Sequence, residues 1–250
     1  MQHQFSRTEL LIGEEGLERL KKSRVYIFGL GGVGSYTAEA LVRAGIGFFK
    51  LIDFDEICLT NINRQIHALH STVGQSKVEV MKQRMLDINP KAEIDIFQTF
   101  YRGEDADFFL ADKPDYVVDA IDTVKSKVSL AKECHLRQIP LISCMGAGNR
   151  LDALSFKVAD ISQTSGCPLA KAVRKLLKKE GITRGFKVVF SPEPALKPLK
   201  QQMSCATNCI CPSGDAHCSQ KRQIPGSVSF VPSVAGLLVA GEIVKEILGY

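Results

Sequence analysis

The sequence predicts an α/β fold, a doubly wound and mostly parallel sheet with an irregular C-terminal extension. Short apolar runs alternate with amphipathic helical segments as far as Asn149, and such alternation favours parallel strands with helices on both faces of the sheet. A glycine-rich turn, Gly29-Leu30-Gly31-Gly32-Val33-Gly34, joins the first apolar run to a helix. Beyond Asn149 the predicted segments are shorter and more irregular.

The predicted elements have recognisable ends. The glycine turn leads into a helix that ends near Gly45, a typical C-cap residue. Val78, Met81 and Met85 lie on one face of a later helix, which Pro90 stops. The sheet is therefore Rossmann-like, with strands expected at 24–28, 48–53, 93–98, 116–121, 140–144, 155–159, 186–190 and 227–231, and helices at 14–22, about 33–45, 76–88, 124–137, 168–180 and 234–248.

Length and composition indicate a single domain over residues 1–250. The chain is 45% hydrophobic, enough for a full core. Its longest apolar stretch, residues 234–241, is much shorter than the roughly 18 residues that a membrane-spanning helix needs. The first residues lack the layout of a secretory signal. We therefore expect a cytoplasmic protein without membrane association, whose eight cysteines are reduced.

Residues that follow three apolar strands predict a nucleotide site. Gly31, Asp53 and Asp122 each come after such a strand, and the carboxyl ends of parallel strands meet at one edge of the sheet. The glycines let the backbone approach a phosphate, Asp53 can accept hydrogen bonds from ribose hydroxyls, and Asp122 can hold Mg²⁺. A tight turn without nucleotide, and an N-cap role for Asp122, are the alternatives.

Two downstream cations indicate the chemistry. Arg64 and Lys77 concentrate the positive charge that attack by a carboxylate on the α-phosphate of ATP demands. For either residue alone, solvated surface charge is the alternative. A dinucleotide carrier needs no such pair, so the set favours nucleotidyl transfer over hydride transfer. A non-catalytic NAD-binding sensor is a competing hypothesis.

These motifs resemble those of ubiquitin-activating enzymes and their bacterial relatives that adenylate sulfur-carrier proteins. The similar segments are residues 29–35, 53–55, 60–65 and 73–77, and the resemblance covers nearly the whole chain. It implies that Arg7 reaches into the site of a second subunit, and hence a homodimer. The implied catalytic residues are Arg7, Arg64, Lys77 and Asp122, and the implied ATP-binding residues are Gly29, Gly31, Gly32, Gly34, Asp53, Asp55, Asn61, Arg64, Lys77 and Asp122, with Asp122 also binding Mg²⁺.

One branch of this superfamily is the most similar. The runs at 4–9, 63–68 and 221–226 resemble those of the tRNA threonylcarbamoyladenosine dehydratases. The resemblance implies that ATP adenylates the carboxylate of threonylcarbamoyladenosine in tRNA, after which the modification cyclises and releases AMP. Adenylation of a ubiquitin-like sulfur carrier is the alternative. Its enzymes generally use a nucleophilic cysteine, and many carry two Cys-x-x-Cys zinc pairs. This chain has no such pair, and Cys167 stands beside Pro168, where a helix is predicted to start.

A basic segment offers a surface for tRNA. Residues 171–187 hold seven lysines and arginines against one glutamate, a local net charge of +6 in a chain of net charge +5. Lys171, Arg174, Lys175 and Lys178 fall on one face of the predicted helix, where they suit a phosphate backbone. A solvated helix face without a ligand is the alternative.

A cysteine-rich loop is predicted at about 200–223. Cys205, Cys209, Cys211 and Cys218 lie within fourteen residues, and four soft ligands suit tetrahedral zinc or an iron-sulfur cluster. The spacing is not that of a standard zinc finger or ribbon. An exposed, redox-labile thiol loop is the alternative, and a sulfur-transfer or redox partner is an open question.

Overall fold

A seven-stranded sheet forms the centre of the computed structural model, which describes residues 2–199 and 225–250. The strand order is β3-β2-β1-β4-β5-β7-β6. Neighbouring strands are parallel from β3 to β7, and β6 at the edge is antiparallel to β7. The strands are β1 (Arg24–Phe28), β2 (Phe48–Ile52), β3 (Glu93–Phe97), β4 (Tyr116–Asp119), β5 (Leu141–Cys144), β6 (Lys157–Asp160) and β7 (Lys187–Phe190).

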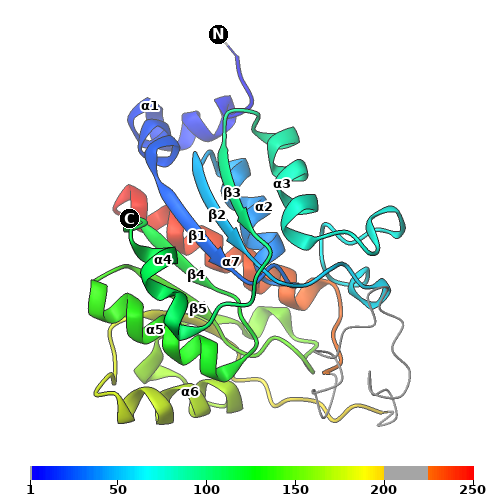
Figure 1. The fold of residues 1–250 in the computed structure, drawn as a ribbon, viewed down its shortest axis with the longest axis vertical. Helices are drawn as coiled ribbons and strands as arrows, with labels where there is room; N and C mark the ends of the chain where they lie inside the picture. The colour runs from blue at the N-terminus through cyan, green and yellow to red at the C-terminus, as the bar shows by residue number, and fades with distance from the viewer. Residues whose placement is uncertain (1, 200–224) are drawn as a thin grey trace.

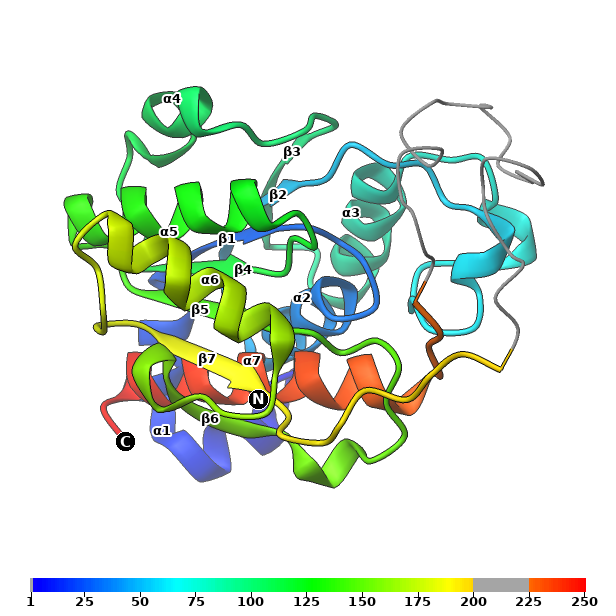
Figure 2. The same cartoon turned by 90° about the horizontal axis from the view of Figure 1, so that it is seen from below.

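Helices cover both faces of this sheet (Figure 1). Figure 2 shows α5 and α6 on one side of the strands and α1 and α7 on the other. Within the described residues, α2, α3 and α7 pack into one apolar cluster and α4, α5 and α6 into a second. The helices are α1 (Ser6–Lys22), α2 (Gly34–Ala44), α3 (Lys77–Ile88), α4 (Ala106–Leu110), α5 (Val124–Arg137), α6 (Pro168–Lys179) and α7 (Phe230–Leu248).

The central strands are buried on both sides. In β1, Val25 and Ile27 belong to the cluster with α2 and α7, whereas Tyr26 and Phe28 belong to the cluster with α5 and α6. A parallel strand covered on both faces has no solvent-facing side to mark with polar residues. This explains why β1 reads as a continuous apolar run in the sequence.

The doubly wound, mostly parallel fold is confirmed, and several element predictions hold closely. Helix α5 has the predicted bounds, and α6 ends one residue early. The short helix α4 was not predicted. Helix α1 begins at Ser6, earlier than expected, because the helix continues across a kink at Gly13, whose φ of 73° is not helical.

The strand predicted at 227–231 is wrong, because Phe230 already begins α7. Val231, Ala235 and Val239 are fully buried at helical spacing, and a short apolar run does not distinguish a buried strand from the start of a buried helix. β6 starts two residues later than predicted and pairs with β7, so the irregular extension joins the main sheet. This pairing supports one domain over residues 1–250, which stays a prediction. The predicted cysteine-rich loop, at about 200–223, lies outside the described residues.

Among the helices of the described ranges, none is both long enough and apolar enough to span a bilayer.

Candidate nucleotide site

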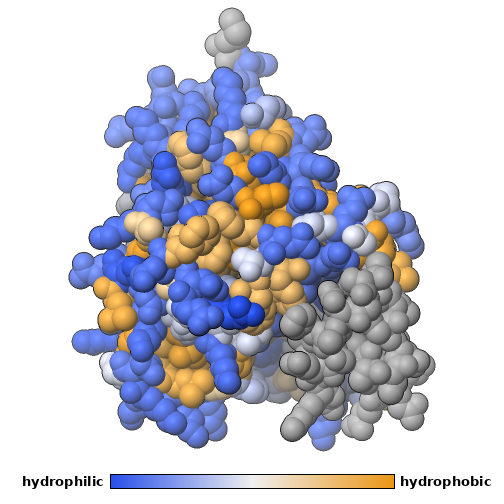
Figure 3. Space-filling view, in the orientation of Figure 1, coloured by the Kyte–Doolittle hydropathy of each residue, from blue (hydrophilic) through white to orange (hydrophobic). Residues whose placement is uncertain are grey.

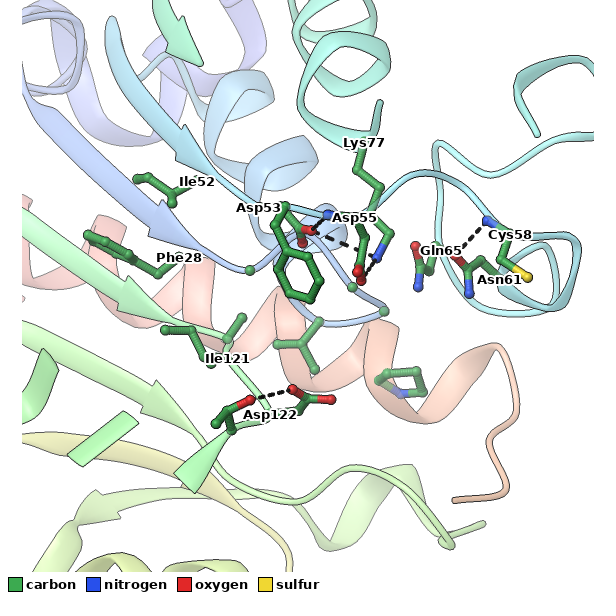
Figure 4. A pocket seen from close by; sticks show the side chains of 18 of the residues that line it. Phe28, Ile52, Asp53, Asp55, Cys58, Asn61, Gln65, Lys77, Ile121 and Asp122 are labelled. Atoms are coloured by element: carbon green, nitrogen blue, oxygen red, sulfur yellow. Dashed lines mark hydrogen bonds and ion pairs between the residues drawn. The ribbon is translucent and has the colours of Figure 1, made fainter. Parts of the chain in front are cut away.

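A cavity of about 470 Å³ opens at the carboxyl ends of β1, β2, β4 and β5. This is the edge of a doubly wound sheet at which ligands bind. The glycine turn, Asp53 and Asp122 all line the cavity, so the chain brings together the residues that the strand ends predicted. Figure 4 shows Asp53 and Asp122 on different sides of the same space. Their roles stay predictions.

The glycine turn borders the cavity, and its glycines meet different constraints. Gly29 has a φ of 92°, in the region where glycine is favoured. A Cβ on Gly34 would lie 1.8 Å from the Gly29 carbonyl oxygen, so α2 can start this close to β1 only without a side chain. On Gly32, a Cβ would lie 3.0 Å from Pro232 of α7, whereas on Gly31 it would meet nothing within 4 Å. The turn thus leaves open space at Gly31, as a phosphate cradle requires.

Asp53 is buried beside the glycine turn. Its Oδ2 accepts a hydrogen bond from the Leu30 amide at 2.6 Å and its Oδ1 one from the Asp55 amide at 2.8 Å. Burial raises the pKa of the Asp53 carboxyl above its ordinary value, while the nearby Lys77 ammonium acts in the opposite direction. Each carboxylate oxygen has a second lone pair, which can accept a ribose hydroxyl.

Lys77 begins α3 and directs its ammonium toward the cavity wall. The side chain is buried, with its Nζ 2.6 Å from Asp55 Oδ2 and 3.9 Å from Asp53 Oδ1. Figure 4 shows these three side chains meeting at one side of the cavity. Asp55 is only half-buried. An entering phosphate would therefore compete with a partly hydrated carboxylate for the Lys77 donors.

Arg64 and Asn61 come from the loop between β2 and α3. The Asn61 Oδ1 accepts a hydrogen bond from the Cys58 amide at 3.1 Å. Arg64 Nη1 donates to the Thr60 carbonyl at 2.8 Å and to Asn63 Oδ1 at 2.9 Å. Burial lowers the pKa of Arg64 from its ordinary value. Both residues line the cavity, and the local bonds hold the guanidinium along the loop.

Asp122 lies in the loop after β4 and is exposed at the cavity. Its Oδ1 accepts a hydrogen bond from the Thr123 hydroxyl at 3.4 Å. Mg²⁺ in nucleotide sites is commonly held by one or two carboxylates together with substrate phosphates. A single exposed carboxylate facing the glycine turn fits that requirement.

Arg7 does not line the cavity of its own chain. It is exposed on α1, which precedes β1 and so lies at the amino ends of the strands, as Figure 1 shows. The cavity is at the opposite ends of the strands. A role for Arg7 in catalysis therefore requires a second subunit.

The basic face of α6 is not uniform. Lys171, Lys175 and Lys178 are exposed, as a ligand surface requires. Arg174 is half-buried, and its guanidinium donates to the carbonyl and the hydroxyl of Thr164. Arg174 therefore ties α6 to the preceding loop, and the three lysines form the accessible part of the predicted surface.

Of the four cysteines in the described residues, Cys134, Cys144 and Cys167 are buried, whereas Cys58 is half-buried and lines the cavity. Cys167 is buried at the N-cap of α6. Burial raises the pKa of Cys134 and of Cys144 to about 12, which keeps both thiols protonated and inert. In the part of the chain that the structure describes, no group of three or more metal-binding side chains comes together. The predicted metal ligands Cys205, Cys209, Cys211 and Cys218 lie outside that part.

Sequence reasoning missed a buried ion pair behind the cavity. Lys127 Nζ donates to Asp119 Oδ2 at 2.8 Å, to Ser143 Oγ at 3.0 Å and to the Cys144 carbonyl at 2.9 Å. These bonds join α5 to β4 and β5 just below the Asp122 loop. One feature of the sequence could have indicated that Lys127 is buried. Its spacing places it on the same apolar helix face as Leu130 and Cys134.

The sequence also missed the two ends of the cavity. Phe54 and Phe100 contact each other edge to face, with ring centroids 5.1 Å apart, and line the end near β2 and β3. Figure 3 shows apolar side chains gathered on the face where β3 and α4 lie. Gly148, Pro225 and Ser227 line the other end, near β5. The turn-rich sequence around Pro225 gave no sign that it would fold back over a site so distant along the chain.

Several known proteins are similar to this chain over most of its length. The model of the ThiF family matches residues 5–250. The tRNA threonylcarbamoyladenosine dehydratase of Bacillus subtilis is 48% identical over 248 residues, which cover 99% of this chain and 96% of that protein. The protein of the same name in Escherichia coli is 38% identical over 209 residues, covering 81% of this chain and 78% of that protein.

Solved structures are also similar. The crystal structure of the E. coli tRNA N6-threonylcarbamoyladenosine dehydratase with AMP superposes with a TM-score of 0.87 at 32% identity, covering 98% of this chain and 94% of that one. The same enzyme with ATP gives a TM-score of 0.85 at 32% identity, with the same coverage of both chains.

Proposed function

The chain belongs to the ThiF family, and on that basis we propose that it is an ATP-dependent enzyme that dehydrates threonylcarbamoyladenosine in tRNA. The observation that carries the proposal is similarity over the full length of a dehydratase, at 48% identity, together with the predicted site residues around one cavity. The E. coli relative has been crystallised with ATP and with AMP. These are the substrate and the product that such a reaction implies.

The first step joins the substrate carboxylate to AMP. A carboxylate oxygen of the threonyl group attacks the α-phosphorus, the bond to the β-phosphate oxygen breaks, and pyrophosphate leaves. Arg64 and Lys77 lie where they can stabilise the charge that develops on the phosphates. The open backbone at Gly31 cradles the phosphates, and Asp53 accepts hydrogen bonds from the ribose.

Asp122 is the residue that would hold Mg²⁺ at the phosphates. The ion supplies charge neutralisation at the leaving pyrophosphate when it is bound. The Asp122 carboxylate is exposed to the cavity, where an ion held against the phosphates can reach it.

The second step closes a ring within the substrate. The carbamoyl group of the modification attacks the adenylated carboxyl carbon, AMP leaves with the carboxylate oxygen, and one proton is lost. No enzyme thiol takes part. This agrees with the burial of Cys167, because the sulfur-carrier alternative generally uses an accessible nucleophilic cysteine.

The exposed lysines of α6 are the proposed contact for the tRNA backbone. The N-cap of α6 lies against the loop after β5, since a Cβ on Gly146 would lie 3.9 Å from Cys167 Sγ. Ala147 and Gly148 of this loop line the cavity. Lys171, Lys175 and Lys178 continue outward along the exposed face. A tRNA held there can place a modified nucleoside at the cavity, and its binding should weaken as salt increases.

The proposal includes a homodimer and a cytoplasmic location. Arg7 lies at the end of the sheet away from its own cavity, so the role implied by resemblance requires the site of a second subunit. A modified tRNA and ATP are both cytoplasmic substrates.

The experiment supplies the protein with ATP, Mg²⁺ and tRNA that carries threonylcarbamoyladenosine. We expect release of AMP and pyrophosphate, and a nucleoside lighter by one water, measured by mass spectrometry of the digested tRNA. The double variant Lys171→Gln/Lys175→Gln should raise the KM for tRNA and make log KM less steep in log salt by about one per lysine.

Two controls make the assay specific. Lys132→Gln removes an exposed lysine on the neighbouring helix that already pairs with Glu180 at 2.7 Å, and its KM should stay near wild type. A ubiquitin-like sulfur carrier replaces tRNA in the other arm. Pyrophosphate exchange that depends on the carrier, with an unchanged nucleoside mass, would refute the proposed function.

A further inference from the structure

The segment 225–227 is held from both sides of the cavity. Asn149, in the loop after β5, donates its amide to the Gly226 carbonyl at 2.7 Å, and its Oδ1 accepts the Gly226 amide at 2.6 Å. On the other side, Asn63 Nδ2 donates to the Ser227 carbonyl at 2.9 Å. Asn63 immediately precedes Arg64. The segment thus spans from the β5 loop to the loop of the proposed catalytic arginine.

Asn149 has a geometry that few residues can supply. Its φ is 58°, a left-handed conformation that asparagine tolerates better than most side chains. Its carbonyl also accepts the Leu196 amide at 2.8 Å. One residue therefore binds the backbone of two segments that are thirty positions apart in the sequence. Glycine would keep the backbone conformation but lose the side-chain oxygen.

The support beneath Asn149 is rigid. Arg150 is 3% exposed, and its Nε donates to the Gly146 carbonyl at 3.0 Å while its Nη1 contacts Ser191 Oγ at 3.4 Å and the Glu193 carbonyl. A buried guanidinium with several acceptors fixes the loop on which it sits. Asn149, which makes the bonds to Gly226, is therefore held in place by the loop around Arg150.

Gly148, next to Asn149, packs directly against the held segment. A Cβ on Gly148 would lie 2.9 Å from Pro225 Cβ, closer than side chains approach. Gly148, Pro225 and Ser227 all line the cavity, and we name these three residues the substrate wall. Pro225 therefore has no space to move toward the β5 loop.

The substrate wall lies at the end of the cavity away from the nucleoside. Asp53 and Phe54 follow β2, and Phe100 follows β3, at one side of the sheet. Gly148 follows β5, which is separated from β2 by β1 and β4. With ribose at Asp53 and phosphates at the glycine turn of β1, the group that attacks the α-phosphate must approach from the side of β4 and β5.

We propose that Asn149 is a positioning residue, which holds the substrate wall so that the acceptor carboxylate is aligned with the α-phosphate. This inference rests on the proposed function for the nature of the acceptor. Alignment of reacting groups contributes strongly to rate, and small displacements are costly. Asn149 should therefore affect the use of tRNA much more than the binding of ATP.

The experiment compares two variants at Asn149 and one in the substrate wall with two matched controls in the full-length protein. Asn149→Gly keeps the backbone conformation and the backbone bond to the Gly226 carbonyl, and removes only the side-chain bond to the Gly226 amide. Asn149→Asp keeps an acceptor oxygen, and Gly148→Ala pushes on Pro225 with every Asn149 bond available. Gly146→Ala adds the same atom where its nearest contact is an ordinary 3.8 Å. Gln138→Gly changes another left-handed residue, φ 55°, at the end of α5.

We expect Asn149→Gly and Gly148→Ala to lower kcat/KM for tRNA about tenfold, the effect of losing one hydrogen bond with some misalignment. The Kd for ATP should change less than about twofold, which is the effect of losing the weakest hydrogen bond. Asn149→Asp should retain most of the activity. Both controls should match wild type in kcat/KM. Hydrogen exchange at the Gly226 amide should accelerate in Asn149→Gly and not in Gln138→Gly.

The outcomes separate this inference from the proposed function. Wild-type protein that fails to convert tRNA refutes the proposed function and with it the alignment of that substrate, while hydrogen exchange still tests whether Asn149 holds Gly226. Active wild type with variants equal to the controls overturns the inference alone. An equal loss of ATP binding and tRNA use also overturns it, as does unchanged exchange at Gly226.

Discussion

Lys77 and Lys127 are both buried lysines near the start of a helix that borders the cavity region, yet their surroundings differ. Lys127 is fully buried and has three acceptors, from Asp119, Ser143 and Cys144. Lys77 is 4% exposed, lines the cavity, and has one close partner, the half-buried Asp55. An ammonium has three donors.

The comparison shows how the same side chain serves two purposes. The ammonium of Lys127 is matched on every donor by fixed groups of two strands, so its charge supports the sheet beneath the Asp122 loop. Lys77 pairs with Asp55, which water reaches, so replacing Asp55 by a phosphate costs little free energy. We therefore propose that Lys127 contributes to stability and that Lys77 binds phosphate. The following predictions test that assignment.

The largest expected effect is the loss of stability in Lys127→Met. Removing one partner of a buried ion pair leaves the Asp119 carboxylate uncompensated in the core, which costs about 3–5 kcal/mol. The free energy of unfolding, measured by urea denaturation, should fall by that amount. Lys77→Met should lose less than Lys127→Met, because Asp55 is partly hydrated and Asp53 keeps its two backbone amide donors.

A double variant tests the cause of that loss. Lys127→Met/Asp119→Leu removes both charges, and replacing a buried ion pair by apolar residues is often close to neutral. The double variant should therefore be more stable than Lys127→Met alone. If it is less stable, the ion pair is not the reason for the effect.

The next effect is the loss of activity in Lys77→Ala. Removing one donor from a site that stabilises developing charge costs about 10²–10³ in kcat. AMP release from ATP and modified tRNA should fall by that factor while the melting temperature changes little. A folded Lys77→Ala protein with wild-type turnover would show that Lys77 does not act on the phosphates.

Mixing variants tests the predicted role of Arg7 at the same site. If each cavity uses its own Lys77 and the partner's arginine, a mixed dimer of Arg7→Ala and Lys77→Ala contains one intact site. Activity should return on mixing two inactive proteins under conditions of subunit exchange. Mixtures without recovery, despite exchange, would argue against a shared site.

The smallest expected effect is on the pH dependence of stability. It involves His67, whose pKa the charge of Lys77 helps to lower. Burial first, and then the Lys77 and Arg84 charges, lower the pKa of His67 to about 3. Unfolded His67 titrates near pKa ~6.5, so below that pH the unfolded chain binds a proton that the folded chain does not. Stability due to neutral His67 is present above about pH 6.5 and is lost as pH falls toward about 3.

Between about pH 7.5 and 5, wild type should lose about 2 kcal/mol more stability than His67→Gln, by the same linkage. Urea denaturation at the two pH values measures the difference. His70→Gln, at an exposed histidine of the same loop, should follow wild type.

The elements that sequence reasoning located well are those whose signal is local. Helix α5 and the strands β1 and β2 carry their own periodicity and end signals, and the glycine turn identifies itself by spacing. The strand predicted at 227–231 failed because its apolar residues face the core as part of α7, which only the packing against α2 reveals. The Lys127 network was not predicted for a related reason, since its acceptors lie on two other elements.

By itself, the sequence determined the doubly wound fold, the glycine turn and the polar residues that follow each strand, because periodicity and strand ends are local properties of the chain. Only the tertiary structure decided which cations are free to meet a phosphate, that Arg7 lies away from its own cavity, and that Asn149 holds residues 225–227 over the site. Those properties depend on which groups share a buried space, and the order of residues along the chain does not show which groups these are.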